Sequence, residues 1–187
     1  MQTLPDRLGP DLRLLLVGIN PSCYAVDHGH YFARPQNRFW PALSASRLGR
    51  PICRALGVDR LRPEHDELLP RFGIGLTDVV KTPSVSASSV TPDMYRQGVP
   101  RLCATIQQCR PRLVAFHGMT GYRPFARFGL NQSQRKLDWG LQPHRLAGIP
   151  LYVLPNPSGA NAHFRPAELI AGYDRLADCL AEILAAE

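Results

Sequence analysis

Two asparagine–proline corners in this sequence carry the side chains best suited to form a site. The first spans Gly18–Ser22 and reads GINPS, and the second spans Leu154–Gly159 and reads LPNPSG. An asparagine side chain both donates and accepts hydrogen bonds, so it can hold a water molecule, but it cannot take up a proton as a carboxylate does. Backbone N–H groups in such corners are oriented donors that can stabilise developing negative charge. The corners therefore indicate a site built on Asn20, Asn156 and backbone groups.

A charged group that activates water or stabilises a cation would have to be a carboxylate elsewhere in the chain, because both corners carry amides. Asp27, Asp78 and Asp93 lie near the ends of the expected strands. We favour Asp93, which follows a flexible serine-rich stretch at residues 86–89 that could bring it over the site. The structural alternative is that an aspartate in the first turn of a helix complements the helix dipole.

Four short apolar runs each lead into a corner rich in glycine, proline or asparagine. Continuous runs of this length are typical of strands buried on both faces of a parallel sheet. The runs are Leu12–Val17, Gly75–Val80, Leu113–Phe116 and Leu151–Leu154.

Helical patterns fill the intervals between these runs. Thr91 is an expected N-cap with Pro92 at the first helical position. The expected helices are Arg38–Leu48, Thr91–Cys109, Gly121–Phe128 and Pro166–Ala185, with residues 49–72 and 129–148 as longer excursions. The alternation predicts one α/β domain over residues 1–187, with a central, mainly parallel four-stranded sheet flanked by helices.

Ligands bind such sheets beyond the carboxyl ends of the strands. The corners follow those ends, so we expect one site formed by residues 18–37, 78–93 and 155–163.

The net charge of +7 favours an anionic partner such as nucleic acid, and nearly all of the positive charge is arginine. The five cysteines include no CxxC pair, which indicates reduced thiols rather than a metal site. No apolar run approaches the ~20 residues that span a bilayer. We therefore expect a soluble cytoplasmic protein with no membrane contact.

Four further blocks join the two corners in a recognisable order: Gly29–Phe32, Pro35–Trp40, Gly73–Thr77 and Gly140–His144. Together they closely resemble the mismatch-specific uracil/thymine DNA glycosylase family of the uracil-DNA glycosylase superfamily, from about Leu14 to the last helix. The resemblance implies that family's fold and a monomeric base-excision repair enzyme of the cytoplasm, acting at the prokaryotic nucleoid. It would flip uracil, and related mispaired or damaged pyrimidines, out of mismatched double-stranded DNA and hydrolyse the N-glycosidic bond, with no cofactor and no metal.

The resemblance also assigns catalytic and base-binding roles. Asn20 matches the residue that positions the attacking water. Asn156 matches the residue that hydrogen-bonds the leaving base or the flanking phosphate. Phe32 matches the aromatic side chain that stacks on the extruded base.

Residues beside these three are expected to complete the pocket and the DNA contact. Ile19 would offer backbone donors, and Tyr24 and Ala25 would set the pocket width. Ser158 and Gly159 would contact DNA phosphate, where a hydroxyl and an unhindered N–H can approach closely.

Ala160 departs from the family, which carries a bulky residue there to fill the gap left by the flipped base. A methyl group cannot fill a base-sized gap, so Asn161 and His163 are the candidates to replace it. We expect comparable uracil release from G:U and A:U pairs, and activity on single-stranded DNA.

Arginines near the corners are candidates to line a DNA groove, and we expect two or three of them to do so. His117 and His144 are expected to be structural, and Phe39 and Trp40 to pack beneath the first corner. The candidate arginines are Arg34, Arg38, Arg123, Arg127 and Arg165.

Two other classes of function compete with the glycosylase. Because both corners carry amides, the chain could be a catalytically weak protein that binds DNA mismatches or lesions. A nucleoside hydrolase or nucleotide-binding protein is the weaker option, since neither a GxGxxG loop nor a GK[ST] phosphate loop is present.

Overall fold

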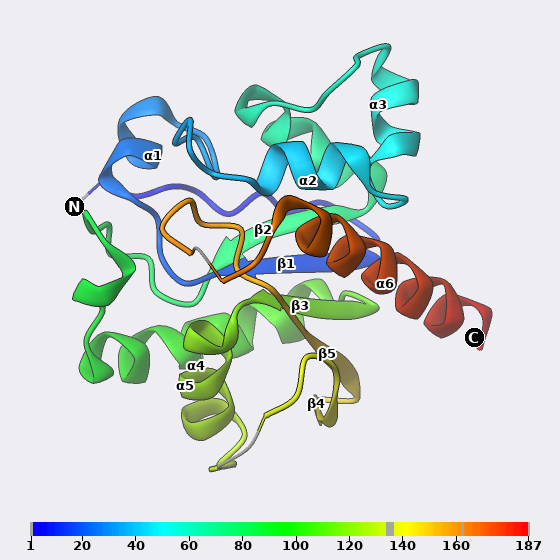
Figure 1. Cartoon of the computed structure of the whole chain (residues 1–187). Coiled ribbons are helices and arrows are strands. Elements are labelled where there is room, and N and C mark those ends of the chain that lie inside the picture. Colours follow the sequence, from blue (N-terminus) through cyan, green and yellow to red (C-terminus); the bar gives the residue numbers. More distant parts are fainter. Residues whose placement is uncertain (1, 134–136, 162, 187) are drawn as a thin grey trace.

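The structure, a computed structural model, describes residues 2–133, 137–161 and 163–186 and is built on a five-stranded sheet (Figure 1). The strands run in the order β2-β1-β3-β5-β4. Four of them are parallel: β1 (Leu14–Gly18), β2 (Ile74–Asp78), β3 (Leu113–His117) and β5 (Ile149–Leu154). Every residue of β1, β2 and β3 is buried, which confirms that the apolar runs form strands covered on both faces.

The expected number of four strands is wrong. The fifth strand, β4 (Gly140–Leu146), pairs antiparallel with β5 at the edge of the sheet and lies in the excursion 129–148. Most of its side chains are exposed or half-buried, and its register shifts between Leu141 and Arg145. An edge strand of this kind carries no continuous apolar run, and Pro143 within it further disguises the pattern.

Helices cover both faces of the sheet (Figure 1). The helices α4 (Pro92–Cys109) and α5 (Met119–Gly129) pack on one face, and α6 (Pro166–Ala185) and α2 (Phe39–Ala45) pack together on the other. Three segments that were not expected to be helical are α1 (Cys23–His28), α3 (Arg50–Leu56) and the 3₁₀ segment η1 (Pro63–Phe72). A short 3₁₀ turn, η2 (Ala87–Ser89), precedes α4. The short helices escape a periodicity argument because they span only six or seven residues.

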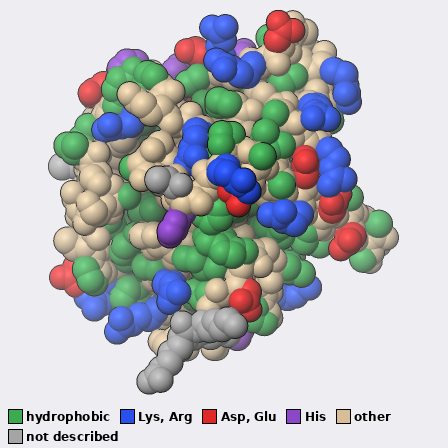
Figure 2. Space-filling view, in the orientation of Figure 1, with side chains coloured by type: hydrophobic (Ala, Val, Ile, Leu, Met, Phe, Trp, Pro, Cys, Tyr) green, Lys and Arg blue, Asp and Glu red, His purple; other side chains and the backbone are tan. Residues whose placement is uncertain are grey.

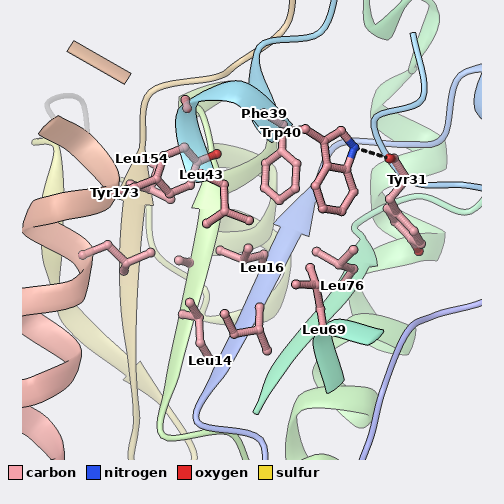
Figure 3. Close-up of a cluster of buried hydrophobic side chains, with 14 of the residues drawn as sticks. Leu14, Leu16, Tyr31, Phe39, Trp40, Leu43, Leu69, Leu76, Leu154 and Tyr173 are labelled. Carbon is pink, nitrogen blue, oxygen red and sulfur yellow. Dashed lines mark hydrogen bonds between the residues drawn. The ribbon is translucent and has the colours of Figure 1, made fainter. Parts of the chain in front are cut away.

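Alternate residues of β1 divide the core into two clusters. Leu14 and Leu16 face the cluster beneath α2 and α6, whereas Leu15 and Val17 face the cluster beneath α4 and α5. Figure 3 shows Phe39 and Trp40 packed over Leu16 in the first of these clusters. Both aromatic residues are almost completely buried, which confirms their expected role beneath the first corner.

None of the helices in the described parts of the chain has the length and apolar character needed to span a bilayer.

Candidate active site

The two asparagine corners meet at a cavity of about 440 Å³ beyond the carboxyl ends of the parallel strands. Asn20 and Asn156 both line this cavity, together with residues from the loops that follow β1 and β2. Residues from each of the expected segments, 18–37, 78–93 and 155–163, line this cavity, which confirms that the three segments meet there. The wall includes Ile19, Asn20, Ala25, Tyr31, Phe32, Asp78, Val85, His117, Asn156, Ser158, Gly159 and Ala160.

The carboxamide of Asn20 is held by the loop that follows β2. Its Nδ2 donates to the carbonyl oxygen of Thr82 at 3.0 Å and to Ser84 Oγ at 2.8 Å, and also lies 3.1 Å from the Pro21 carbonyl. These acceptors occupy both N–H bonds of the amide. The orientation follows from this network, and it leaves Oδ1 as the acceptor that Asn20 can offer to a ligand or a water molecule.

Asn156 is fixed in the opposite sense. Its Oδ1 accepts a hydrogen bond from the Ser158 backbone N–H at 2.9 Å, so its Nδ2 is the group that can donate into the cavity. Gly118, at φ 94°, makes room for it, because a Cβ on Gly118 would lie 3.1 Å from Asn156 Cβ. The two corners thus present an acceptor on one side and a donor on the other.

Phe32 lines the cavity from a left-handed backbone conformation, with φ 54°. Residues other than glycine adopt this region rarely, and when they do it often marks a functional site. Its ring stacks on Phe39, with centroids 4.1 Å apart, and meets the edge of His117 at 5.4 Å. The preceding residue is anchored as well, because Trp40 Nε1 donates to the Tyr31 carbonyl at 3.0 Å (Figure 3).

The structure separates the two residues expected to set the pocket width. Ala25 is buried and lines the cavity. Tyr24 stacks on His28, with ring centroids 3.9 Å apart, and lies outside the lining. Ser22 also lines the cavity, and its hydroxyl caps α1 by accepting from the Ala25 N–H.

Asp93, the favoured carboxylate, is not brought to the cavity. Its side chain is 77% exposed in the first turn of α4, where it pairs with Arg96. It therefore occupies the dipole-complementing position that was its structural alternative. Asp27 is also exposed, on α1.

Asp78 is the carboxylate that the structure places in the cavity wall. It ends β2, is 3% exposed, and burial raises its pKa to about 7. The sequence signal was its position near the end of the second expected strand. The flexible stretch at residues 86–89 favours Asp93 at the level of sequence, where the packing of the Asp78 carboxyl group cannot be seen.

His117 forms part of the wall as a neutral imidazole. Its Nε2 lies 2.9 Å from the Tyr173 hydroxyl, and burial lowers its pKa to about 3. This contact agrees with the structural role expected for it.

Arg38 holds the loop after β5 in place through side-chain hydrogen bonds. The guanidinium of Arg38 donates to the carbonyl oxygens of Ser158 at 3.0 Å, Asn161 at 2.5 Å and Phe164 at 2.6 Å. Arg38, one of the candidates to line a DNA groove, thus has both terminal nitrogens engaged by the loop, which favours a structural role. The sequence alone could not show which backbone carbonyls would surround it.

Gly159 is required by packing. A Cβ at this position would lie 2.6 Å from the Gln36 carbonyl oxygen, so the loop can approach the segment that precedes α2 only with glycine here. Ala160 and His163 are exposed, and Asn161 Nδ2 donates to the Asn156 carbonyl at 3.0 Å. Of the residues expected to touch DNA, Ser158, Gly159 and Ala160 lie at the cavity itself.

The other candidate arginines occupy different surroundings. Arg34 lines the cavity and donates to the Val85 carbonyl at 3.2 Å, which links two of the cavity loops. Arg123 and Arg127 are exposed on α5, and Arg165 pairs with Glu168 at the start of α6. Figure 2 shows Lys and Arg side chains scattered over the viewed face rather than gathered in one block.

Comparison with known proteins identifies a family and shows a likeness to solved structures. The sequence model described as "Uracil DNA glycosylase superfamily" matches residues 5–177. A solution NMR structure of a candidate uracil DNA glycosylase from Methanosarcina acetivorans is similar, with a TM-score of 0.54 and 21% sequence identity. The match covers 94% of this chain and 98% of the other, so the two proteins share a fold over nearly their whole lengths.

Proposed function

The chain belongs to the uracil DNA glycosylase superfamily, and on that premise we propose that it is a monofunctional uracil-DNA glycosylase of the mismatch-specific family. In this proposal it flips uracil out of DNA and hydrolyses the N-glycosidic bond, leaving an abasic site. The observation that carries the proposal is the meeting of Asn20, Asn156 and Phe32 around one cavity. Its volume of about 440 Å³ lies in the range of small-ligand pockets.

The extruded base would be held by stacking and by edge hydrogen bonds. Phe39 covers one face of the Phe32 ring, so a base that enters the cavity would stack on the remaining face. Asn156 Nδ2 would donate to a carbonyl oxygen of uracil, because Ser158 already engages the Oδ1 of Asn156. This bond strengthens as negative charge develops on the departing base, which favours the transition state over the bound substrate.

Water would approach the sugar from the side of Asn20. The glycosidic bond breaks through an oxocarbenium-like sugar, so the attacking water needs mainly to be positioned. The Asn20 Nδ2 bonds to Thr82 and Ser84 fix the carboxamide and aim Oδ1 as the acceptor for that water.

A lysine nucleophile for strand cleavage finds no support in the described cavity wall. The Nζ of Lys81 lies 2.8 Å from Asp6 Oδ1 and 3.1 Å from the Tyr31 hydroxyl, so its ammonium group is engaged beside the site. Lys136 lies outside the described residues. We therefore infer simple hydrolysis, without a Schiff-base intermediate.

The proposed partner is double-stranded DNA that carries mismatched uracil, and single-stranded DNA is a second substrate. In this proposal the protein acts as a monomer in the cytoplasm, on nucleoid DNA. Ser158, Ala160, Asn161 and His163 lie on the loop that would meet the DNA backbone and the gap in the duplex. Ala160 is exposed at the cavity rim and too small to fill the gap, which supports low selectivity for the opposite base.

A base-release assay tests the proposal. Oligonucleotides with labelled uracil, as single strands and opposite guanine or adenine, are incubated with excess protein, and free uracil and abasic sites are counted. We expect stoichiometric release from every substrate. A protein that shifts the DNA in a binding assay but releases no uracil would be a lesion-binding module, and the glycosylase proposal would be wrong.

A further inference from the structure

The buried carboxyl group of Asp78 lines the cavity, and the function proposed above leaves it unused. Its Oδ2 is fully buried and has no hydrogen-bond partner among the described protein atoms. A buried carboxylate oxygen without a partner is costly, so one that borders a cavity is best satisfied by a water molecule or a substrate within it.

The neighbouring strand is shaped to admit this carboxyl group. Gly18 on β1 pairs with Asp78 on β2, and a Cβ on Gly18 would lie 2.3 Å from Asp78 Oδ1. Only glycine leaves this space. Gly18 lies two residues before Asn20, so the Asp78 carboxyl packs against the short stretch of chain that carries the proposed water-positioning amide.

Charged groups from three other segments surround Asp78. Asp6, from the N-terminal segment, accepts from Lys81 Nζ at 2.8 Å and from Arg101 Nη1 of α4 at 3.0 Å. The hydroxyl of Tyr31, which also lines the cavity, accepts from Lys81 Nζ. Burial has the largest effect on the pKa of Asp78, and it raises that pKa. Among the neighbours, Lys81, Arg101 and the Tyr31 hydroxyl lower the pKa, whereas Asp6 raises it.

The result is a carboxyl group whose pKa of about 7 suits proton transfer near neutral pH. Exposed Asp93 lies in different surroundings, since its side chain is 77% exposed and pairs with Arg96 on the same helix turn.

We propose that Asp78 is the general base of this site and takes a proton from the water molecule that attacks C1′ of the deoxyribose. This inference rests on the glycosylase function proposed above. The water oxygen bonds to C1′ while the bond from C1′ to uracil N1 breaks, and the electron pair of that bond leaves with uracil as an anion. The water proton passes to the Asp78 carboxylate and then to the uracil anion or to solvent, so the carboxylate is restored.

The test compares Asp78→Asn with the matched control Asp93→Asn, which replaces an exposed aspartate outside the cavity. Uracil release from a G:U duplex is measured under single-turnover conditions from pH 5 to 9. We expect the wild-type rate to rise with pH around an apparent pKa near 7. Asp78→Asn should be at least about tenfold slower at pH 8 and nearly independent of pH, because general-base catalysis contributes ~10²–10⁴-fold. Asp93→Asn should follow the wild type.

Two further measurements distinguish catalysis by Asp78 from a purely structural role. Binding of a duplex with uncleavable 2′-fluoro-deoxyuridine should be unchanged in Asp78→Asn, and the ¹³Cγ resonance of Asp78 in the free wild-type protein should titrate near pH 7. An Asp78→Asn rate within twofold of wild type, an unaltered pH profile, or a ¹³Cγ titration near pH 4 would overturn the inference. These outcomes leave the glycosylase function intact, whereas no uracil release by the wild type at any pH overturns both.

Discussion

Arg38 Nη2 lies 3.0 Å from the carbonyl oxygen of Ser158, and this bond ties the loop after β5 to the residues that open α2. The same guanidinium holds the carbonyls of Asn161 and Phe164. The backbone N–H of Arg38 also donates to the Pro157 carbonyl at 3.0 Å. Arg38, at the start of α2, thus holds Pro157 and Ser158 of the second corner, directly after Asn156.

Replacing Arg38 should therefore impair catalysis, although Arg38 itself would not contact the base. In Arg38→Ala the loop loses three charge-assisted hydrogen bonds, and Asn156 loses its fixed position. We expect kcat/KM for a G:U duplex to fall by ~10²-fold, the scale of loss for a misplacement of about 1 Å. The control is Arg165→Ala, which removes an exposed arginine of the same loop region and should retain more than half of the wild-type rate. Equal rates for the two variants would contradict the positioning role.

Asn156→Ala removes the proposed donor to the leaving base. Because that bond matters most as charge develops, the expected loss lies in the single-turnover rate, by roughly 10²–10³-fold, with little change in binding of a 2′-fluoro-deoxyuridine duplex. Stopped assays for free uracil and fluorescence anisotropy for binding measure the two quantities. A variant that loses binding but keeps its single-turnover rate would show that Asn156 serves DNA contact rather than catalysis.

Ala160→Leu should supply the bulk that the cavity rim lacks. An apolar wedge helps offset an unstacking cost of a few kcal/mol, so release from duplex DNA should become faster, by about fivefold, while release from single strands stays the same. Ala160→Ser is the size-matched control. In the wild type, release from G:U and A:U duplexes should agree within about threefold. A strong wild-type preference for G:U would show that another residue already probes the opposite strand.

His117 should make the protein sensitive to acid. The unfolded chain protonates this histidine near pH 6.5, but burial lowers its pKa in the folded protein to about 3. The unfolded state therefore binds more protons between these values, so stability is complete above about pH 6.5 and is lost as pH falls toward 3. The free energy involved is on the order of a few kcal/mol.

The measurement is the Tm of the wild type and of His117→Asn from pH 4 to 8. The Tm of the variant should fall less steeply with acid. Asp78 acts in the opposite direction, because its raised pKa stabilises the folded state below about pH 4 and that contribution is lost as pH rises through 7. The Tm of Asp78→Asn should therefore fall less than that of the wild type as pH rises toward 7. Parallel curves of Tm against pH for all three proteins would contradict both assignments.

The site's location follows from the sequence because buried parallel strands have a distinctive pattern and ligands bind at their carboxyl ends. That reasoning placed Asn20 and Asn156 at one cavity although the corners are distant in the chain. Phe39 and Trp40, expected to pack beneath the first corner, are buried in the core.

The parts that the sequence did not reveal depend on packing between distant segments. The role of Arg38 depends on three backbone carbonyls beyond residue 157, and the requirement for Gly159 depends on the Gln36 carbonyl. Asp78 and Asp93 are equivalent by residue type and by position near a strand end. Only the burial of one and the exposure of the other distinguish them.

The most direct test of the account is a crystal structure of the protein bound to a duplex that carries uncleavable 2′-fluoro-deoxyuridine opposite guanine. The account predicts that uracil lies outside the base stack, in the cavity between Asn20 and Asn156, with its ring against Phe32 and Asn156 Nδ2 within hydrogen-bond distance of a uracil oxygen. A uracil that remains stacked in the duplex, or that binds away from this cavity, would contradict it.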